Sequence, residues 1–497
     1  MNKNPPYKIK VKAPRSEQKY DVTIGLEVHA HLKAASKLFC RCSTDFGAAP
    51  NENVCPVCTG MPGSLPVINK DAVAMGVRAA LALNLKVNPV STFARKNYFY
   101  PDLPKGYQIS QFDQPLASNG YLDIKTGDEE RRIGIERAHL EEDAGKLIHT
   151  GATGIAGATG ALVDLNRAST TLLEIVSDPD MTSPEQAVEY LRTLRQRLIF
   201  AGAIDGHMEE GGLRCDANIS LKPKGTEPLG VKVEIKNLNS FKFLQKALEH
   251  EIARQRRLLA GGNAVIQETR GFDPASEDTF SMRKKEESHD YRYFPEPDLL
   301  PLRISEEMIS QVQADMPELP DEKKNKYSEW GLSNDQVELL LGDLATDKLF
   351  EDCVALSDCD KREFAKWFLN VFLGEINLSD HSLATMKIEP QEIVKTFQLK
   401  QAGKVSEKAI PTILQRCIAE GVGAEDVVES ENLAVIEDLG FIESAVDTVI
   451  SANQSQVADY KSGSEKIFNY LIGQTMRELK GKADIKTVRE ILRKRLG

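Results

Sequence analysis

The chain of 497 residues has no long hydrophobic run. No segment approaches the roughly 20 consecutive apolar residues that a membrane-spanning helix requires. The opening residues, Met1-Asn-Lys-Asn-Pro-Pro6, also lack the apolar stretch of a secretory signal. We therefore expect a cytoplasmic protein without a membrane partner.

The sequence also lacks a disulfide framework and an excess of positive charge. Four of the eight cysteines stand alone, which does not suit a disulfide-stapled fold in a chain of this length. The net charge of −11 argues against a nucleic-acid partner, because phosphate contacts need Lys and Arg. However, residues 461–497 hold ten Lys and Arg against four Asp and Glu. This basic end is typical of a protein that touches nucleic acid there, and a solvated pair of basic helices is the alternative.

The length predicts two or three domains, because a single core stops growing well below 497 residues. The first 300 or so residues mix strands, Gly/Pro turns and a few helices, which favours an α+β domain. Helical periodicity predicts helices over residues 71–85, 184–200 and 241–260. Beyond a Pro-rich passage at 293–301 the pattern is almost entirely helical. We place domain boundaries near residues 310 and 425.

Several expected strands carry acids and bases on their polar faces. Residues 20–32 alternate with period two, so apolar side chains fall on one face and Glu27, His29 and His31 on the other. Two later segments repeat the pattern, and their polar positions are Arg214 and Asp216 in the first and Glu234 and Lys236 in the second. The pattern indicates one shared site for anions and a metal. Solvated sheet faces are an equally simple interpretation.

Carboxylates in two further segments could join this face. The loop His139-Leu-Glu-Glu-Asp-Ala-Gly-Lys146 concentrates three acids, and Glu174 lies inside an apolar strand where an unpaired charge would be costly if buried. Magnesium prefers carboxylate and phosphate oxygens from separate segments. We therefore expect a magnesium site, with a charged turn as the alternative for the loop.

Residues 93–107 interleave cations with aromatic rings, including Arg95, Lys96, Tyr98 and Lys105. Cations suit phosphate oxygens and flat rings suit a base, so the segment could bind a nucleotide or an RNA end. The edge of an aromatic core lined by lysine stems is the alternative. With no obvious covalent nucleophile, the inventory favours phosphoryl transfer, in which positioning and charge neutralisation do most of the catalysis.

The other four cysteines form two close pairs, Cys40-Arg-Cys42 and Cys55-Pro-Val-Cys58. Two such pairs joined by a short loop can close a tetrahedral thiolate shell around zinc. Because cysteine fills all four positions, no site is left for water. We therefore predict a structural zinc that holds the loop 40–58.

Several short stretches of the sequence, taken together, match the pattern of a known family. They include Ile24-Gly-Leu-Glu-Val-His29, the acidic loop at 139–146, and residues 95–105, 107–111, 208–210, 213–218, 234–240 and 290–298. In this order they closely resemble the B subunit of the tRNA-dependent aspartyl/glutamyl amidotransferase. The resemblance covers nearly the whole chain.

The resemblance implies a fold and an activity. It implies a glutamine-synthetase-like antiparallel-sheet cradle over residues 1–310, a helical domain over 311–425, and a small helical tail over 426–497 that binds tRNA rather than DNA. ATP phosphorylates the side-chain carboxylate of Glu-tRNA(Gln) or Asp-tRNA(Asn) in this family, and ammonia then displaces the phosphate.

The resemblance also implies two protein partners in a heterotrimeric amidotransferase. Its A component, the glutaminase, releases the ammonia from glutamine, and its C component wraps the other two chains. No amidase signature occurs here, so glutamine hydrolysis is not expected of this chain.

Carried over by position, the resemblance implies four magnesium ligands, Glu27, His29, Glu142 and Glu174, with Lys96 beside the phosphates. It gives no role to His31. This chain departs from the family pattern at Ala94, at Gly212, and in residues 166–172, which lack the usual Gly and Pro before Glu174. A tRNA-docking scaffold without a competent site is therefore one alternative. A stand-alone ammonia ligase for a small molecule is another.

Overall fold

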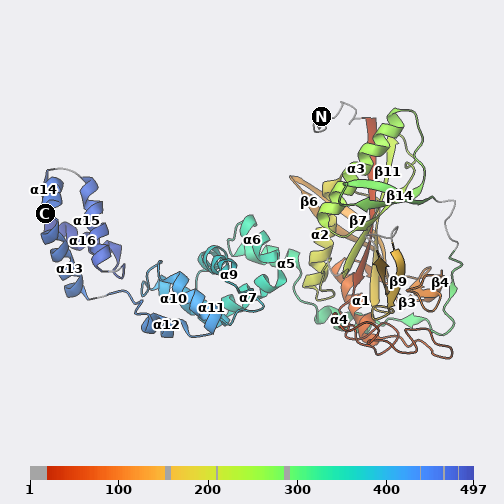
Figure 1. Cartoon of the computed structure of the whole chain (residues 1–497), viewed down its shortest axis with the longest axis horizontal. Helices are drawn as coiled ribbons and strands as arrows, with labels where there is room; N and C mark the ends of the chain where they lie inside the picture. Colours follow the sequence, from red (N-terminus) through yellow and green to blue (C-terminus); the bar gives the residue numbers. More distant parts are fainter. Residues whose placement is uncertain are drawn as a thin grey trace. The chain divides into compact units, whose positions relative to one another are not determined.

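The computed structural model describes residues 19–151, 158–208, 211–284, 291–436, 438–462, 465–479 and 481–497. The chain divides into two compact units, the first ending at Pro320 and the second beginning at Asp321 (Figure 1). The boundaries expected near residues 310 and 425 stay predictions. Parts of the quoted runs at 208–210 and 290–298 lie outside the described residues, as does Lys480 of the basic segment 461–497.

The first unit is built on a large, mostly antiparallel sheet of twelve strands. Its main path runs β14-β13-β12-β11-β1-β10-β7-β5-β4-β15, with β6 on β7 and β2 on β6, and only the described pair β12–β13 is parallel. The strands are β1 (Tyr20–His31), β2 (Lys86–Val87), β4 (Phe93–Asn97), β5 (Tyr107–Gln111), β6 (Ala117–Thr126), β7 (Glu129–Glu142), β10 (Thr171–Ser177), β11 (Leu213–Pro223), β12 (Val233–Leu238), β13 (Glu268–Asp273), β14 (Asp278–Lys284) and β15 (Phe294–Pro295). A mixed α and β architecture with an antiparallel sheet is thus confirmed.

Three helices pack on the apolar face of this sheet (Figure 1). They are α1 (Lys70–Ala82), α2 (Pro184–Phe200) and α3 (Phe241–Ala260). The expected helices at 184–200 and 241–260 are confirmed, and Ser183 and Ser240 cap them by accepting hydrogen bonds from backbone N–H groups. The helix expected over 71–85 ends earlier because Asn84 adopts a left-handed conformation with φ of 56°.

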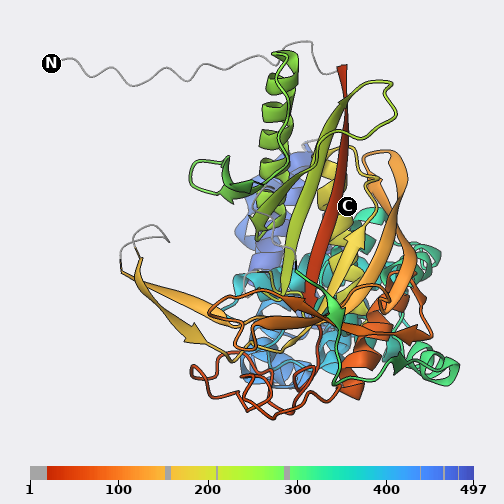
Figure 2. The same cartoon turned by 90° about the vertical axis from the view of Figure 1, so that its right-hand side faces the viewer.

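Two small sheets and a short helix complete the first unit. One sheet joins β3 (Val90–Ser91) to β16 (Leu302–Arg303), and α4 is Glu306–Ala314. The other joins β8 (Lys146–Gly151) to β9 (Ala158–Asp164), a hairpin that stands apart from the main sheet in Figure 2. The residues that connect β8 to β9 lie outside the described residues.

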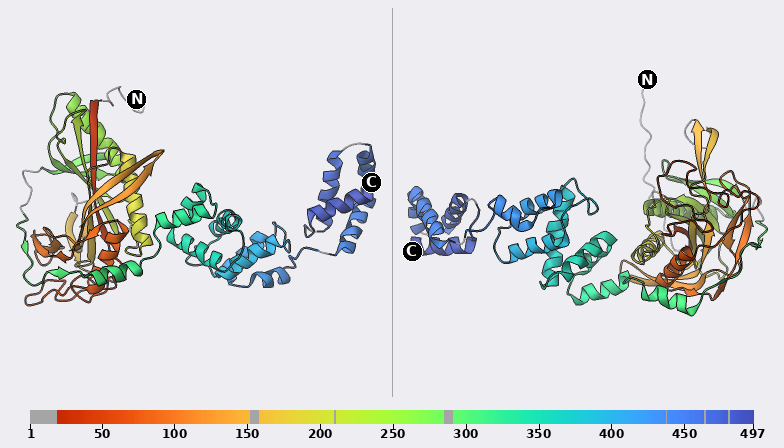
Figure 3. Two further views of the ribbon diagram at one scale, coloured as in Figure 1. Left: turned by 180° about the vertical axis from the view of Figure 1, so that it is seen from behind. Right: turned by 90° about the horizontal axis from the view of Figure 1, so that it is seen from below.

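The second unit is helical, as the change of pattern after the Pro-rich passage predicts (Figure 3). Aromatic residues, among them Phe350, Phe364 and Phe397, pack in its first part, and α13 to α16 enclose a separate apolar cluster. None of the helices in the described ranges is long and apolar enough to cross a membrane. The helices are α5 (Pro320–Glu329), α6 (Asn334–Leu341), α7 (Leu344–Ala355), α8 (Lys361–Trp367), a π-helical turn (Phe368–Phe372), α9 (Leu373–Leu378), α10 (Pro390–Gln401), α11 (Ile410–Glu420), α12 (Ala424–Ser430), α13 (Leu439–Ala452), α14 (Gln454–Lys461), α15 (Glu465–Glu478) and α16 (Ile485–Leu496).

Candidate functional site

The polar faces of the central strands meet in one surface. Glu174 of β10 pairs with His29 of β1 on one side and with His139 of β7 on the other. His29 in turn lies opposite Arg214 of β11. Paired residues in antiparallel strands project to the same side, so these four side chains form a row across the sheet. The helices lie on the opposite, apolar face.

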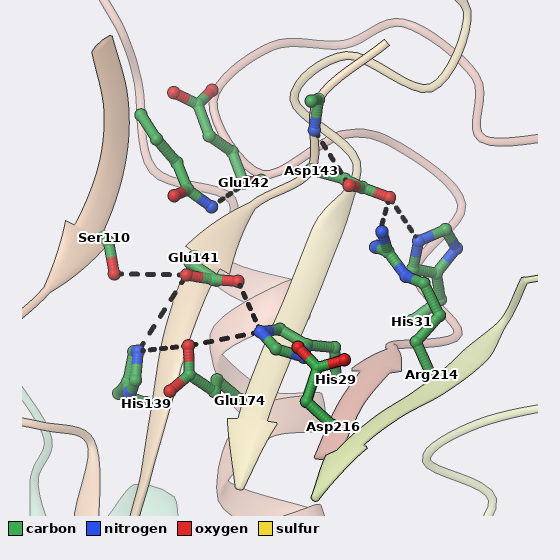
Figure 4. A network of polar contacts seen from close by, with 12 residues as sticks. His29, His31, Ser110, His139, Glu141, Glu142, Asp143, Glu174, Arg214 and Asp216 are labelled. Carbon is green, nitrogen blue, oxygen red and sulfur yellow. Dashed lines mark hydrogen bonds and ion pairs between the residues drawn. The ribbon is translucent and has the colours of Figure 1, made fainter. Parts of the chain in front are cut away.

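Three residues on this surface converge into what we call the acid cluster, His29, Glu141 and Glu174 (Figure 4). The Nε2 atom of His29 lies 3.3 Å from Glu174 Oε2 and 3.7 Å from Glu141 Oε1. One ligand atom from each residue falls within 4.8 Å of the others. The Glu141 side chain is only 3% exposed, and the Ser110 hydroxyl donates a hydrogen bond to it.

The cluster fits a divalent cation. Carboxylates from separate strands are the ligands that magnesium prefers, and an imidazole can bind a metal when it is neutral. Two buried carboxylates this close together also require a cation to offset their mutual repulsion. The His29 ring, when protonated, also lies where it can supply part of that charge.

The ionisation of His29 and Glu174 follows from their contact. Burial by itself would lower the pKa of His29, but its hydrogen bond to Glu174 and the charges of Glu141, Glu174 and Asp216 outweigh burial and raise the pKa to about 9. Burial would raise the pKa of Glu174, but His139 and His29 hold that pKa well below its ordinary value. At neutral pH the metal-free cluster therefore contains an imidazolium and an ionised carboxylate.

Divalent-cation binding is therefore expected to strengthen as pH rises from 7 to 9, because a metal competes with the proton on His29. Below the pKa, the apparent Kd for Mg²⁺ should fall by up to about tenfold per pH unit and then level off. Isothermal titration calorimetry in buffers of different ionisation enthalpy would measure both affinity and proton release. His29→Asn should remove the pH dependence, and an unchanged dependence in that variant would contradict this assignment.

Glu27 and Glu142, two of the four expected ligands, lie outside the acid cluster. Glu27 shares its face but is one row away, opposite Asp216, and accepts a hydrogen bond from Asn218 Nδ2 at 2.7 Å. Glu142 is turned toward β5, where its carboxylate accepts hydrogen bonds from Lys105 Nζ at 2.5 Å and from the Ile109 backbone N–H at 2.8 Å. The structure thus brings together His29 and Glu174, two of the four expected ligands, and Glu141 is the third member of the acid cluster.

His31, to which the sequence gives no role, pairs with a buried acid. Its Nε2 atom lies 2.7 Å from Asp143 Oδ2, which also contacts the guanidinium groups of Arg214 at 2.7 Å and Arg167 at 3.1 Å. Burial would raise the pKa of Asp143, but Arg214, His31 and Arg167 hold that pKa well below its usual range. Arg214 and His31 therefore fix the end of β7 beside the acid cluster.

Two cations of the segment 93–107, Lys96 and Arg95, have different surroundings. Lys96 lies beside the acid cluster with Nζ 5.0 Å from the centre of the Tyr291 ring, and Tyr98 packs edge-on against the same ring. Burial alone would lower the pKa of Lys96, but the charges of Glu141 and Glu174 contribute to a net rise. Lys96 therefore keeps its charge at neutral pH.

Arg95, in contrast, serves the fold. Its guanidinium forms a bidentate ion pair with the buried carboxylate of Glu296, at 2.7 and 2.9 Å, and reaches Asp298 at 3.0 Å. The guanidinium also stacks on the Tyr107 ring, 4.2 Å from its centre. These contacts hold β15 against β4, and they bring Tyr291 and Tyr293 over Lys96.

Asp216, Glu234 and Lys236 form a second charged group on the same surface. Lys236 Nζ lies 2.5 Å from Asp216 and 3.0 Å from Glu234. Burial by itself would lower the pKa of Lys236, but these two carboxylates raise it. The negative charge of Asp216 reaches His29 across the strand pair, so this group acts on the acid cluster electrostatically.

Two pockets open on the polar surface. The Lys96 pocket, of about 410 Å³, is lined by Lys96, His139, Glu174 and Tyr293, among others. The Glu27 pocket, of about 340 Å³, is lined by Glu27, Asn218 and Lys232, among others. Glu174 of the acid cluster therefore lines the first pocket, and Glu27 lines the second.

Sequence reasoning does not single out Glu141, His139 or Asp143. The run that contains them is recognisable, but its three acids cannot be separated without knowing which strand lies beside them. One signal is present in the sequence, because the spacing of His139 and Glu141 is that of two residues on the same face of a strand.

The four clustered cysteines meet as their spacing predicts. Their sulfur atoms lie within 4.8 Å of one another, which fits a tetrahedral zinc site. A hydrogen bond from Cys40, the Cys55 backbone and the nearby Lys37 ammonium lower the pKa of the Cys58 thiol to about 4. Lys37 is fully buried, and its Nζ lies 3.5 Å from Cys58 Sγ and 2.7 Å from the Asn53 carbonyl oxygen. A buried ammonium here stabilises the Cys58 thiolate and would offset part of the negative charge of four zinc-bound thiolates.

Comparisons with known proteins agree on one family. The family model described as the GatB/GatE catalytic domain matches residues 22–310, and the GatB domain matches residues 348–496. The B subunit of the aspartyl/glutamyl-tRNA(Asn/Gln) amidotransferase of Geobacter sulfurreducens is 47% identical over 478 residues, which cover 96% of this chain and 99% of the relative. The proteins of the same description from Persephonella marina and Carboxydothermus hydrogenoformans are also 47% identical, with the same coverage.

Proposed function

The chain belongs to the family of B subunits of the aspartyl/glutamyl-tRNA(Asn/Gln) amidotransferase, and from that membership we propose that its polar sheet surface activates and amidates an aminoacyl side chain. The substrate is Glu-tRNA(Gln) or Asp-tRNA(Asn), and ATP drives the reaction. The observation that carries this proposal is the acid cluster, flanked by Lys96 and by two pockets that could receive two substrates.

The proposed chemistry explains why acids and cations share one surface. A carboxylate is a poor electrophile, so one of its oxygens first attacks the γ-phosphorus of ATP and ADP departs. Ammonia then attacks the carbonyl carbon of the acyl phosphate, and phosphate leaves. The first step brings two anions together, and preorganised positive charge must offset their repulsion.

Residues of this chain supply much of that positive charge. Lys96 keeps its proton and lines the same pocket as Glu174 of the acid cluster, where it can contact phosphate oxygens. Magnesium, when bound by His29, Glu141 and Glu174, would neutralise part of the phosphate charge. Glu27 and Glu142 stay candidate ligands on the resemblance. Asp143 holds Arg214 and His31 in place, and Tyr98, Lys105, Asp216, Glu234 and Lys236 support the surrounding surface.

The remaining assignments follow the resemblance. The sheet is proposed as a glutamine-synthetase-like cradle, with a structural zinc on Cys40, Cys42, Cys55 and Cys58. The tail over residues 426–497 would contact the tRNA, because its last part is basic. The glutaminase partner would supply ammonia, and the C component would complete the complex.

Reconstitution of the chain with the glutaminase and the C component tests the proposal. We expect conversion of at least one misacylated tRNA to its amidated form, dependent on ATP and glutamine, and ATP turnover that requires the misacylated tRNA. Assays on Glu-tRNA(Gln) and Asp-tRNA(Asn) in parallel would identify the substrate. ATP turnover that does not depend on misacylated tRNA would refute the proposal in favour of a docking scaffold. Amidation at the full rate by a chain truncated after residue 420 would refute it in favour of a small-molecule ligase.

A further inference from the structure

The Lys96 pocket and the Glu27 pocket share two lining residues that no motif singled out. Within the described residues, Glu136 and Arg137 are the residues that line both pockets. Glu136 carries the wrong charge to attract a phosphate or a carboxylate. Arg137 is therefore the cation at the junction of the two pockets.

The strand register explains this position. Arg137 precedes His139 by two residues on β7, so the two share the polar face. It lies opposite Val176 of β10, which lies opposite Glu27 of β1. The short apolar side chain of Val176 thus lies between Arg137 and Glu27. These three residues form the row next to the one that holds His29 and Glu174. No charged side chain of that row stands between the two pockets.

The Arg137 guanidinium is also available to an incoming anion. Arg137 Nη1 lies 2.7 Å from Glu136 Oε1, and the Glu136 side chain is 56% exposed. Such surface pairs contribute little to stability and are easily exchanged. Lys105, Arg95 and Arg214 are instead committed to the buried carboxylates of Glu142, Glu296 and Asp143.

We propose that Arg137 is a catalytic residue that contacts both substrates where they react. This inference rests on the proposed function. The fork of a guanidinium can bind two anionic oxygens at once, so Arg137 can hold the γ-phosphoryl group from one pocket and the side-chain carboxylate from the other. A carboxylate oxygen forms a bond to the γ-phosphorus, the bond from that phosphorus to the β-bridging oxygen breaks, and ADP takes the electron pair. Arg137 keeps its protons throughout, and it offsets the charge that builds up between the two anions.

The test uses the reconstituted complex carrying Arg137→Ala or Arg137→Lys. We expect Arg137→Ala to lower kcat for amidation about a hundredfold to a thousandfold, as loss of a preorganised transition-state donor does. Arg137→Lys should recover only part of the rate, because an ammonium keeps the charge but not the fork. Methylguanidine added to Arg137→Ala should restore activity severalfold, which a merely structural role for Arg137 would not allow.

A second measurement locates the effect in the first chemical step. With glutamine omitted, release of ADP that depends on misacylated tRNA reports carboxylate activation alone, and this release should fall in Arg137→Ala as much as amidation does. Arg132→Met is the matched control, because Arg132 is on the same strand but pairs with the exposed Asp123 at 2.8 Å. That variant should keep both rates.

Two outcomes would overturn the inference. One is an Arg137→Ala complex within twofold of the unsubstituted rate. The other is loss of activity that methylguanidine does not restore, accompanied by a lowered melting temperature, which would make Arg137 structural. Failure of the proposed function itself would look different, because the unsubstituted complex would then show no ATP-dependent amidation.

Discussion

Glutamine in place of Glu141 is expected to lower ATP-dependent amidation about a hundredfold to a thousandfold while leaving glutamine hydrolysis by the glutaminase partner unchanged. The substitution removes one of the two carboxylates that face His29 and leaves a neutral group of the same size. Both the affinity for Mg²⁺ and the raised pKa of His29 should fall. Calorimetry with Mg²⁺ and assays of the reconstituted complex would measure these changes.

Glu142→Gln is the matched comparison, since the two glutamates are adjacent. Glu142 is 1% exposed and bound to Lys105, so its neutralisation leaves a buried ammonium without its counter-charge. Breaking a buried pair in this way costs about 3–5 kcal/mol, and we expect a lower melting temperature with Mg²⁺ affinity retained. If Mg²⁺ binding is instead lost in Glu142→Gln and kept in Glu141→Gln, the ligand is Glu142, as the resemblance implies.

Loss of the zinc site should have the largest effect on stability. Structural zinc in small thiolate sites contributes about 10–16 kcal/mol of apparent binding free energy, which is available to folding. Cys58→Ser is expected to abolish zinc binding, to expose residues 43–53 to proteases and to lower the melting temperature. The buried Lys37 adds to the cost, because it would lose the Cys58 thiolate that offsets its charge.

Zinc content by atomic absorption, limited proteolysis and thermal unfolding would measure these effects. Cys359→Ser is the control, because Cys359 lies outside the four-cysteine group and accepts a hydrogen bond from Ser357. It should keep about one zinc per chain. A purified chain that holds no zinc and unfolds at the same temperature as Cys58→Ser would contradict the assignment.

Local patterns in the sequence are enough to predict much of the fold. Period-two alternation in residues 20–32 predicts the strand and the face shared by Glu27, His29 and His31, because successive side chains of a strand must point to opposite sides. Helical periodicity over residues 184–200 predicts α2 to the residue. The spacing of the four cysteines predicts their convergence, because a short loop between two close pairs leaves few other arrangements.

Family resemblance supplies what local patterns cannot. Alternation leaves a solvated face as an equal possibility, and the recognised runs connect that face with a reaction. The resemblance does not separate the acids at 141, 142 and 143, whose side chains take three different directions. Glu141 enters the acid cluster, Glu142 turns to Lys105, and Asp143 turns to His31 and Arg214.

The sequence by itself determined which residues share a strand face, where the chain changes from sheet to helix, and which family it resembles. The first two depend on residues close together in the chain, and the third depends on the order of short runs along it. Only the tertiary structure decided which glutamate meets His29, that Asp143 engages His31, that Arg95 is held by Glu296, and that Arg137 lies between two pockets. Each of these contacts joins strands that are distant in sequence, and each depends on the register between them. A shift of one residue in that register would turn every side chain of the strand to the opposite face.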